Sequence, residues 1–321
     1  MKRFFNVLAL ILVLTATQGF AADGYPVRPI RFIVPFPAGG GTDTVARILA
    51  AKLTEFWGQQ VVIDNRSGAQ GNIGTALGAK AVPDGYTITL AQSGCVVINP
   101  HLYSDPGFDT LRDIAAVSRA MEMPYALVLH PSVPAKTVKE LVLLAKQNPG
   151  KLNYASVTSS SQLVAELFKL TTATDMVHVP YRGAAPAMLD LIAGNVSLSF
   201  LAPTLATQHV KTGQLRALVV MRDKRLDTLP DVPTAVEAGY PALNNVFEWY
   251  GVTVPASTSR ETIAKLNSGI VRALNSADVS ARMRSLGQTP SPSTPAEFAE
   301  YIRAEFERWG KIVKASGVKV D

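Results

Sequence analysis

Cysteine is almost absent from this chain, because Cys95 is the single one among 321 residues. A disulfide needs two thiols and a thiolate zinc site needs several, so neither can form within one copy of the chain. Cys95 itself is expected to be a small buried residue rather than a nucleophile. The fold must therefore be stabilised by an apolar core.

Long apolar runs are also scarce, and the one near the N-terminus is short. Lys2 and Arg3 precede an apolar stretch from Val7 to Ala16, and small residues follow as far as Ala22. Spanning a bilayer takes about 20 apolar residues, whereas this order of charge, apolar stretch and small residues is typical of a secretory signal peptide. We predict a signal peptide at residues 1–21, a periplasmic mature chain and no membrane insertion of that chain. A buried N-terminal helix is the alternative.

Charge of one sign does not accumulate anywhere in the sequence. The formal net charge is +6, from 31 basic and 25 acidic residues, and loss of Lys2 and Arg3 with the leader leaves 29 against 25, or +4. The basic residues are scattered, so we expect no nucleic-acid partner. A mildly positive surface does favour the collection of anionic solutes.

Catalytic and cofactor motifs are missing as well. A GxGxxG match at Gly39 fails at Thr44, and the first lysine after the glycines is Lys52, too late for a P-loop. The four histidines are dispersed, without HExxH or GxSxG around them. We expect no catalytic residue, no metal and no cofactor. Asp64, at the end of a predicted strand, keeps a nicotinamide-dinucleotide-dependent enzyme as an alternative.

What the chain does contain is a regular alternation of β-rich and helical segments, which is typical of an α/β fold. The strand after the leader, for example, precedes a helix with Val45, Leu49 and Leu53 on one face. About 300 residues favour two domains over one. We predict two α/β lobes joined near residues 121–126 and 243–250, with lobe 1 comprising 22–123 and 248–321, and lobe 2 comprising 124–247. The predicted strands are 30–35, 61–64, 87–91, 125–130, 152–156, 196–200, 215–220 and 249–254.

A ligand site is expected where strands end and helices begin, because ligands of open α/β sheets bind outside the carboxyl ends of the strands. The glycine-rich segment after the first strand lets the backbone approach a ligand closely, and the next helix offers unpaired N–H groups to an anion. A glycine turn that serves only the chain's geometry is the alternative. The candidate residues in this segment are Phe36, Pro37, Ala38, Gly39, Gly40, Gly41, Thr42 and Asp43.

The opposite lobe offers hydroxyls after the strand at 152–156, although helix capping also explains one or two of them. A further strand end that enters a helix, with weaker polar content, lies at Ala202-Pro203-Thr204. The remaining candidates are Gln92, Ser93, Thr158, Ser159, Ser160, Tyr181, Leu201, Ala202, Pro203 and Glu248.

Several motifs in order along the chain resemble the Bug-type solute receptors of tripartite tricarboxylate transporters. They are Tyr25-Pro26 with Pro29-Ile30, Val34-Pro35-Phe36-Pro37-Ala38-Gly39-Gly40-Gly41-Thr42-Asp43, Asn65-Arg66 with Gly68-Ala69 and Gly71-Asn72-Ile73-Gly74, Pro83-Asp84-Gly85-Tyr86-Thr87, His178-Val179-Pro180-Tyr181-Arg182-Gly183, Pro230-Asp231-Val232-Pro233-Thr234 and Trp249-Tyr250-Gly251. The resemblance implies a type II periplasmic-binding-protein-like fold, a ligand cleft between lobes, and a small organic carboxylate held by the glycine loop and delivered to a membrane permease without catalysis. A monomer is expected. A receptor that serves a membrane sensor is the alternative.

The second lobe departs from the family pattern in ways that bear on the ligand. Ser156 and Thr158 stand where glycines are usual, Gln162 replaces a histidine, and Leu201-Ala202-Pro203 replaces polar residues. A buried ammonium group needs acceptors, which hydroxyls and apolar side chains supply poorly. We therefore predict a carboxylate with an apolar or aromatic body, or a simple dicarboxylate, rather than an amino acid. Glu248 favours the alternative of an amino acid ligand, because its carboxylate could accept hydrogen bonds from an ammonium group.

Overall fold

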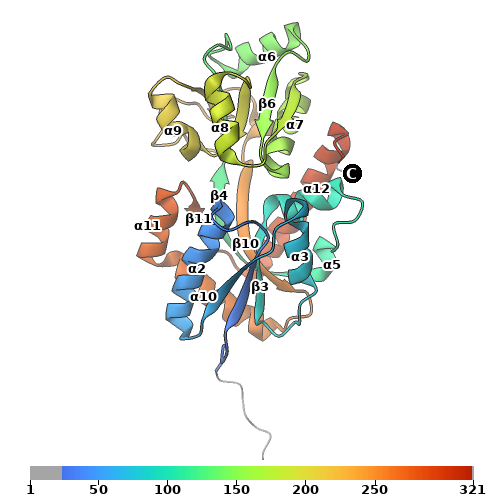
Figure 1. Cartoon of the computed structure of the whole chain (residues 1–321), viewed down its shortest axis with the longest axis vertical. Coiled ribbons are helices and arrows are strands. Elements are labelled where there is room, and N and C mark those ends of the chain that lie inside the picture. The colour runs from blue at the N-terminus through green and yellow to red at the C-terminus, as the bar shows by residue number, and fades with distance from the viewer. Residues whose placement is uncertain (1–23, 320–321) are drawn as a thin grey trace, which may run out of the picture.

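The computed structural model describes residues 24–319, and the predicted signal peptide lies outside them. The described chain forms two α/β lobes, as the sequence predicts, each built around one sheet (Figure 1). The sheet of lobe 1 has six strands in the order β11-β4-β10-β3-β1-β2, and that of lobe 2 has five in the order β7-β6-β8-β5-β9.

The lobe 1 sheet combines a parallel half with an antiparallel half. Strand β1 pairs in parallel with β2 and β3, and β10 pairs antiparallel with β3 on one side and with β4 on the other. β10 is therefore the strand that joins the two halves. The strands are β1 (Ile30–Val34), β2 (Val61–Asn65), β3 (Thr87–Gln92), β4 (Ile114–Pro124), β10 (Phe247–Pro255) and β11 (Thr289–Pro290).

The lobe 2 sheet is smaller, and its strands come from one continuous stretch of chain. Strand β6 pairs in parallel with β7 and β8, whereas β5 pairs antiparallel with β8 and β9. The strands are β5 (Ala126–Leu129), β6 (Asn153–Ser156), β7 (Val177–Pro180), β8 (Leu198–Leu201) and β9 (Arg216–Val220).

Helices flank both sheets, and their ends follow local sequence signals. Helix α2 buries Val45, Leu49 and Leu53 against the sheet and ends at Gly58, which has the left-handed φ of 62°. Helix α12 begins with a capping box between Thr294 and Glu297. The helices are α2 (Gly41–Trp57), η1 (Ala69–Gly71), α3 (Asn72–Ala79), the π-helix η2 (Gly94–Ile98), α4 (Asn99–Leu102), α5 (Thr110–Asp113), α6 (Val138–Gln147), α7 (Ser159–Thr172), α8 (Ala184–Ala193), α9 (Pro203–Lys211), η3 (Pro241–Leu243), α10 (Arg260–Asn275), α11 (Ala277–Ser285) and α12 (Pro295–Ser316).

The chain passes between the two sheets twice. Pro124 ends β4 in the first sheet and Ala126 begins β5 in the second, so Tyr125 alone separates them. The return runs from Val220 at the end of β9 to Phe247 at the start of β10. Figure 1 shows β4 and β10 as the strands that extend from the lower lobe towards the upper one.

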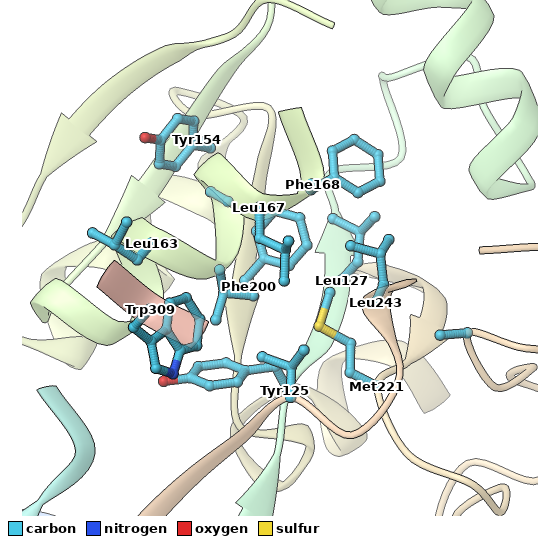
Figure 2. Close-up of a cluster of buried hydrophobic side chains, with 14 of the residues drawn as sticks. Tyr125, Leu127, Tyr154, Leu163, Leu167, Phe168, Phe200, Met221, Leu243 and Trp309 are labelled. Atoms are coloured by element: carbon cyan, nitrogen blue, oxygen red, sulfur yellow. The ribbon is translucent and has the colours of Figure 1, made fainter. Parts of the chain in front are cut away.

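Apolar packing also connects the lobes along one side of the molecule. Helix α12 starts on lobe 1 and packs against α7 of lobe 2, with Trp309 and Val313 in one buried cluster with Leu163 and Phe168. Figure 2 labels Trp309, Leu163 and Tyr125 among the side chains of this cluster. The two lobes therefore share part of their core at this side.

Candidate functional site

A cavity of about 530 Å³ lies between the lobes. Lobe 1 contributes the loop between β1 and α2, and lobe 2 contributes the first turns of its helices and the end of β8. The floor comes from the passages between the sheets. The lining residues are Phe36, Pro37, Ala38, Gly40, Gly41, Thr42, Gln92, Met123, Tyr125, Val157, Thr158, Ser161, Arg182, Gly183, Ala184, Ala187, Met188, Ser199, Phe200, Leu201, Ala202, Leu205, Glu248 and Tyr250.

The glycine loop of lobe 1 is held in place from behind by Asp43. This carboxylate accepts hydrogen bonds from the Gly39 backbone N–H (2.9 Å), from Arg47 Nε (2.8 Å) and from Asn65 Nδ2 (3.0 Å). Burial would raise the pKa of Asp43, but the hydrogen bonds from Arg47, Gly39 and Asn65 hold that pKa below its ordinary value. Asp43 is thus an ionised support of the loop, and the backbone in front of it faces the cavity.

Three helix N-termini that face the cavity have no side-chain cap. They belong to α2 with Gly40 at the N-cap, α8 with Gly183 and α9 with Ala202. Unpaired N–H groups and the positive end of the helix dipole favour an anion at such a place. The end of α9 offers fewer such groups, because Pro203 has no N–H and the Leu205 N–H donates to Ala202 O. Because α2 belongs to lobe 1 whereas α8 and α9 belong to lobe 2, helix N-termini face the cavity from both sides. Arg182, an exposed residue directly before the α8 N-cap, adds a positive charge to the lining.

The N-terminus of α7 differs, because its own side chains satisfy it. Thr158 Oγ1 accepts from the Ser161 backbone N–H (3.2 Å), and Ser161 Oγ in turn accepts from the Thr158 backbone N–H (3.1 Å). This reciprocal pair is a capping box. The capping interpretation of these hydroxyls therefore applies to Thr158, although it also lines the cavity.

A buried carboxylate forms part of the floor. Glu248, 5% exposed, accepts hydrogen bonds from Tyr125 OH (2.6 Å), Ser93 Oγ (2.9 Å) and Gln92 Nε2. Ser160 Oγ, from α7 of lobe 2, lies 3.3 Å from Ser93 Oγ. Burial raises the pKa of the Glu248 carboxyl above its ordinary value, and the hydrogen bonds led by Tyr125 and Ser93 act in the opposite direction. The polar groups of the floor are thus directed mainly at Glu248.

The remaining wall is apolar and comes mostly from lobe 2. These side chains offer a ligand contact surface without hydrogen bonds, so they favour an apolar ligand body. They are Phe36, Met123, Val157, Ala187, Met188, Phe200, Leu201 and Leu205.

The structure brings many of the predicted site residues to this one cavity. Those in the lining are Phe36, Pro37, Ala38, Gly40, Gly41, Thr42, Gln92, Thr158, Leu201, Ala202 and Glu248. The other predicted residues are not part of the lining: Gly39, Asp43, Ser93, Ser159, Ser160, Tyr181 and Pro203.

Local contacts explain why these seven are displaced from the lining. Asp43 binds Gly39 within the loop, and Ser93 donates to Glu248. Ser159 and Ser160 are buried in the first turn of α7, and Pro203 is buried at the start of α9. Tyr181 OH donates to Asp190 Oδ2 of α8 at 2.6 Å, so this side chain turns towards its own lobe.

Several lining residues were not predicted from the sequence. Arg182 and Gly183 directly follow the predicted Tyr181, and a strand ending at Pro180 would have placed both at a carboxyl end. Met123 and Tyr125 flank the first passage, and Tyr250 lies two residues after Glu248 on the same face of β10. The residue types of Met123, Tyr125 and Tyr250 do not indicate a ligand site. Their positions next to the passages between the lobes do.

Asp64, the strand-end acid that a dinucleotide-dependent enzyme would use, is already paired with two arginines. Its carboxylate accepts from Arg31 Nε (2.7 Å) and Arg66 Nε (2.8 Å). These hydrogen bonds and the attraction of both arginines hold the pKa of Asp64 below its ordinary value, against the effect of burial. The acid of a dinucleotide site must instead bind ribose hydroxyls.

Comparison with known proteins assigns the chain to a family. The sequence model of the family described as tripartite tricarboxylate transporter family receptor matches residues 45–318. The chain belongs to this receptor family. The receptor is 36% identical to Protein BugT of Bordetella pertussis over 322 residues, which cover 98% of each chain.

Solved structures agree with this assignment. The R. palustris protein Rpa4515 with adipate is 34% identical to the receptor, with a TM-score of 0.81 over 92% of this chain and 99% of that one. The periplasmic binding protein BugD is 32% identical, with a TM-score of 0.78 over 92% and 99%. MatC from Rhodopseudomonas palustris with bound malate is 31% identical, with a TM-score of 0.78 over 90% and 100%.

Proposed function

We propose that the receptor binds a small organic carboxylate in the interlobe cavity and passes it, chemically unchanged, to the membrane permease of a tripartite tricarboxylate transporter. The observation that carries this proposal is the set of uncapped helix N-termini of α2, α8 and α9, which face one cavity from both lobes. A carboxylate on the α2 terminus satisfies backbone N–H groups that otherwise face solvent.

The ligand is a carboxylate with an apolar or aromatic body, or a simple dicarboxylate. The apolar wall of lobe 2 supports the first description, and Arg182 with the α8 N-terminus supports a second carboxylate opposite the first. Relatives solved with adipate and with malate are consistent with both. Glu248 would be the counter-ion of an amino acid, but it already accepts from three donors, so an ammonium group gains less from it.

We assign the moving bodies to lobe 1, residues 22–123 and 248–321, and lobe 2, residues 124–247. The two sheets and the passages at Tyr125 and before Phe247 support these boundaries. Ligand that touches helix ends of both lobes favours their closure about the passages, a hinge mechanism.

The receptor acts in the periplasm after export and cleavage behind Ala21. Kinship with periplasmic binding protein BugD supports this location. Within residues 24–319, no helix is long and apolar enough to cross a membrane. N-terminal sequencing of protein recovered from the periplasm should begin at Ala22, and an intact leader there would contradict the proposal.

Calorimetry with a matched ligand panel tests the ligand class. Adipate, hexanoate and 6-aminohexanoate share a six-carbon chain and differ at one end, and benzoate and glutamate extend the panel to an aromatic acid and an amino acid. We expect binding by members without an ammonium group. Tight binding confined to 6-aminohexanoate and glutamate would contradict the ligand class, and no binding by any carboxylate would contradict the function.

A further inference from the structure

A contact between the lobes occurs outside the cavity, at the turn between α11 and β11. Gly287 in this turn belongs to lobe 1 and has φ +73°, and it lies against Thr204 in the first turn of α9 of lobe 2. A Cβ on Gly287 would collide with Thr204 Cγ2 and would lie 2.9 Å from its Oγ1 and 3.0 Å from its Cβ. Only a residue without a side chain lets the turn approach α9 so closely.

The turn conformation alone does not explain this closeness. Gly213 has nearly the same φ, +75°, but a Cβ there would meet nothing within 4 Å. Both glycines relieve the backbone strain of a positive φ, whereas Gly287 also makes room for the opposite lobe. The two effects are therefore separable by experiment.

The contact lies directly behind the ligand cavity. Thr204 stands between Ala202 and Leu205, which both line the cavity, and it belongs to the uncapped turn that faces the ligand. Thr204 and Gly287 themselves are outside the lining. Figure 1 shows α9 and α11 on the same side of the molecule, away from α12, so the contact is remote from the shared core of α12 and α7.

We propose that Gly287 is a positioning residue for ligand binding: by admitting Thr204 against the α11–β11 turn, it sets the first turn of α9 at the distance from lobe 1 that the bound ligand requires. This proposal rests on the proposed function, because it concerns the affinity for the same carboxylate. A side chain at position 287 pushes α9 outwards and reduces the fraction of receptor in the binding-competent arrangement, which lowers the apparent affinity in proportion.

A double-mutant cycle between positions 287 and 204 tests the proposal. The probe is adipate, or hexanoate or benzoate if the wild type binds one of them more tightly. Gly287→Ala should weaken probe binding about tenfold, through the reduced competent fraction. Gly213→Ala, which carries the same backbone strain without the collision, should bind as the wild type does. Adding Thr204→Ala to Gly287→Ala removes the colliding methyl and should restore most of the affinity, and Thr204→Ala alone completes the cycle.

A second variant enlarges the opposite partner and leaves the strained turn intact. Thr204→Leu should weaken the probe as Gly287→Ala does, whereas Gln208→Leu, at an exposed position one turn further along α9, should not. Equal affinities of Gly287→Ala and Gly213→Ala, or a loss that Thr204→Ala does not relieve, would overturn the role of Gly287. Absence of probe binding by the wild type would instead overturn the proposed function, and the role of Gly287 with it.

Discussion

At the scale of single residues, Glu248 decides how the floor of the cavity is organised. A buried carboxylate is tolerated only where hydrogen bonds replace its hydration. Glu248 obtains them from the end of β3 and from Tyr125 at the first passage, and Ser160 of lobe 2 lies beside those donors. One side chain thus links both lobes and both passages.

The raised pKa of Glu248 predicts a particular pH dependence of stability. Because the folded-state pKa lies above the unfolded value, the native state holds the proton more tightly. The contribution of this tighter proton binding to the free energy of unfolding is complete below the ordinary glutamate pKa, about 4.3. It is lost as pH rises through the folded-state pKa of Glu248. Thermal unfolding from pH 4 to pH 8 should show Glu248→Gln becoming more stable relative to the wild type as pH rises. A difference that stays constant across this range would contradict the prediction.

Thr42 offers a test of the carboxylate site on α2. Its side chain is 8% exposed and lines the cavity, with a long contact of 3.4 Å from Oγ1 to Tyr250 OH. Thr42→Val should weaken the binding of the best panel ligand by about 1–3 kcal/mol, the usual loss for a buried polar group without its partner. Thr44→Val is the control, since its hydroxyl donates to Gly40 O and lies outside the lining. Unchanged calorimetric affinity in Thr42→Val would remove this hydroxyl from the site.

Residue types alone do not show whether a polar side chain of the site donates to a ligand or to another residue of the protein. Gln92, Ser93 and Ser160 are polar residues at element ends, which is why the sequence predicts them as ligand contacts. In the fold, the first two donate to Glu248, and Ser160 lies beside them. This allocation depends on β3, β10 and α7 meeting in space, and that meeting has no local sequence signal.

At the scale of elements, periodicity and end signals predict most strands, but β4, β7 and β11 are not among the predicted strands. The burial of β4 changes irregularly along Ile114–Pro124, and its register with β10 shifts between Tyr250 and Gly251 and again between Val252 and Thr253. Such irregularities interrupt the alternation on which strand prediction depends. The π-helix Gly94–Ile98 escaped prediction for a related reason, because a short buried apolar run does not distinguish helix from strand.

The packing of α12 on α7 predicts a strong dependence of stability on Trp309. This side chain is 2% exposed, and its Nε1 donates to Glu305 Oε2 at 3.0 Å. Trp309→Ala should lower the free energy of unfolding by about 3–5 kcal/mol, the range for deleting a large buried aromatic side chain. Leu189→Ala, at a position 69% exposed, should change it by no more than about 0.5 kcal/mol. Urea denaturation measures both, and similar midpoints for the two variants would contradict this account of the shared core.

At the scale of the whole molecule, the two lobes are expected to close around the ligand. The hinge proposal places the rotation at the passages at Tyr125 and before Phe247, where the chain runs between the two sheets. Helix ends that face the cavity from both lobes would gain contacts when they approach one ligand. Small-angle scattering should show a smaller radius of gyration at saturation with the best panel ligand. A panel member that does not bind in calorimetry serves as the control and should leave the radius of gyration unchanged. An unchanged radius with the ligand that does bind would contradict the hinge mechanism.

The place of β10 in the lobe 1 sheet also fixes the order in which the molecule can be completed. Strands β1, β2 and β3 lie on one side of β10 and β4 lies on the other, yet β10 follows all of lobe 2 in the chain. Because a chain is synthesised from its N-terminus, every strand of lobe 2 exists before β10 does. Until then, β3 and β4 have open edges, which are exposed to pairing with other chains. Lobe 2 comes from one continuous stretch of chain, so its sheet can form first. The sheet of lobe 1 can be completed only after β10 has been synthesised.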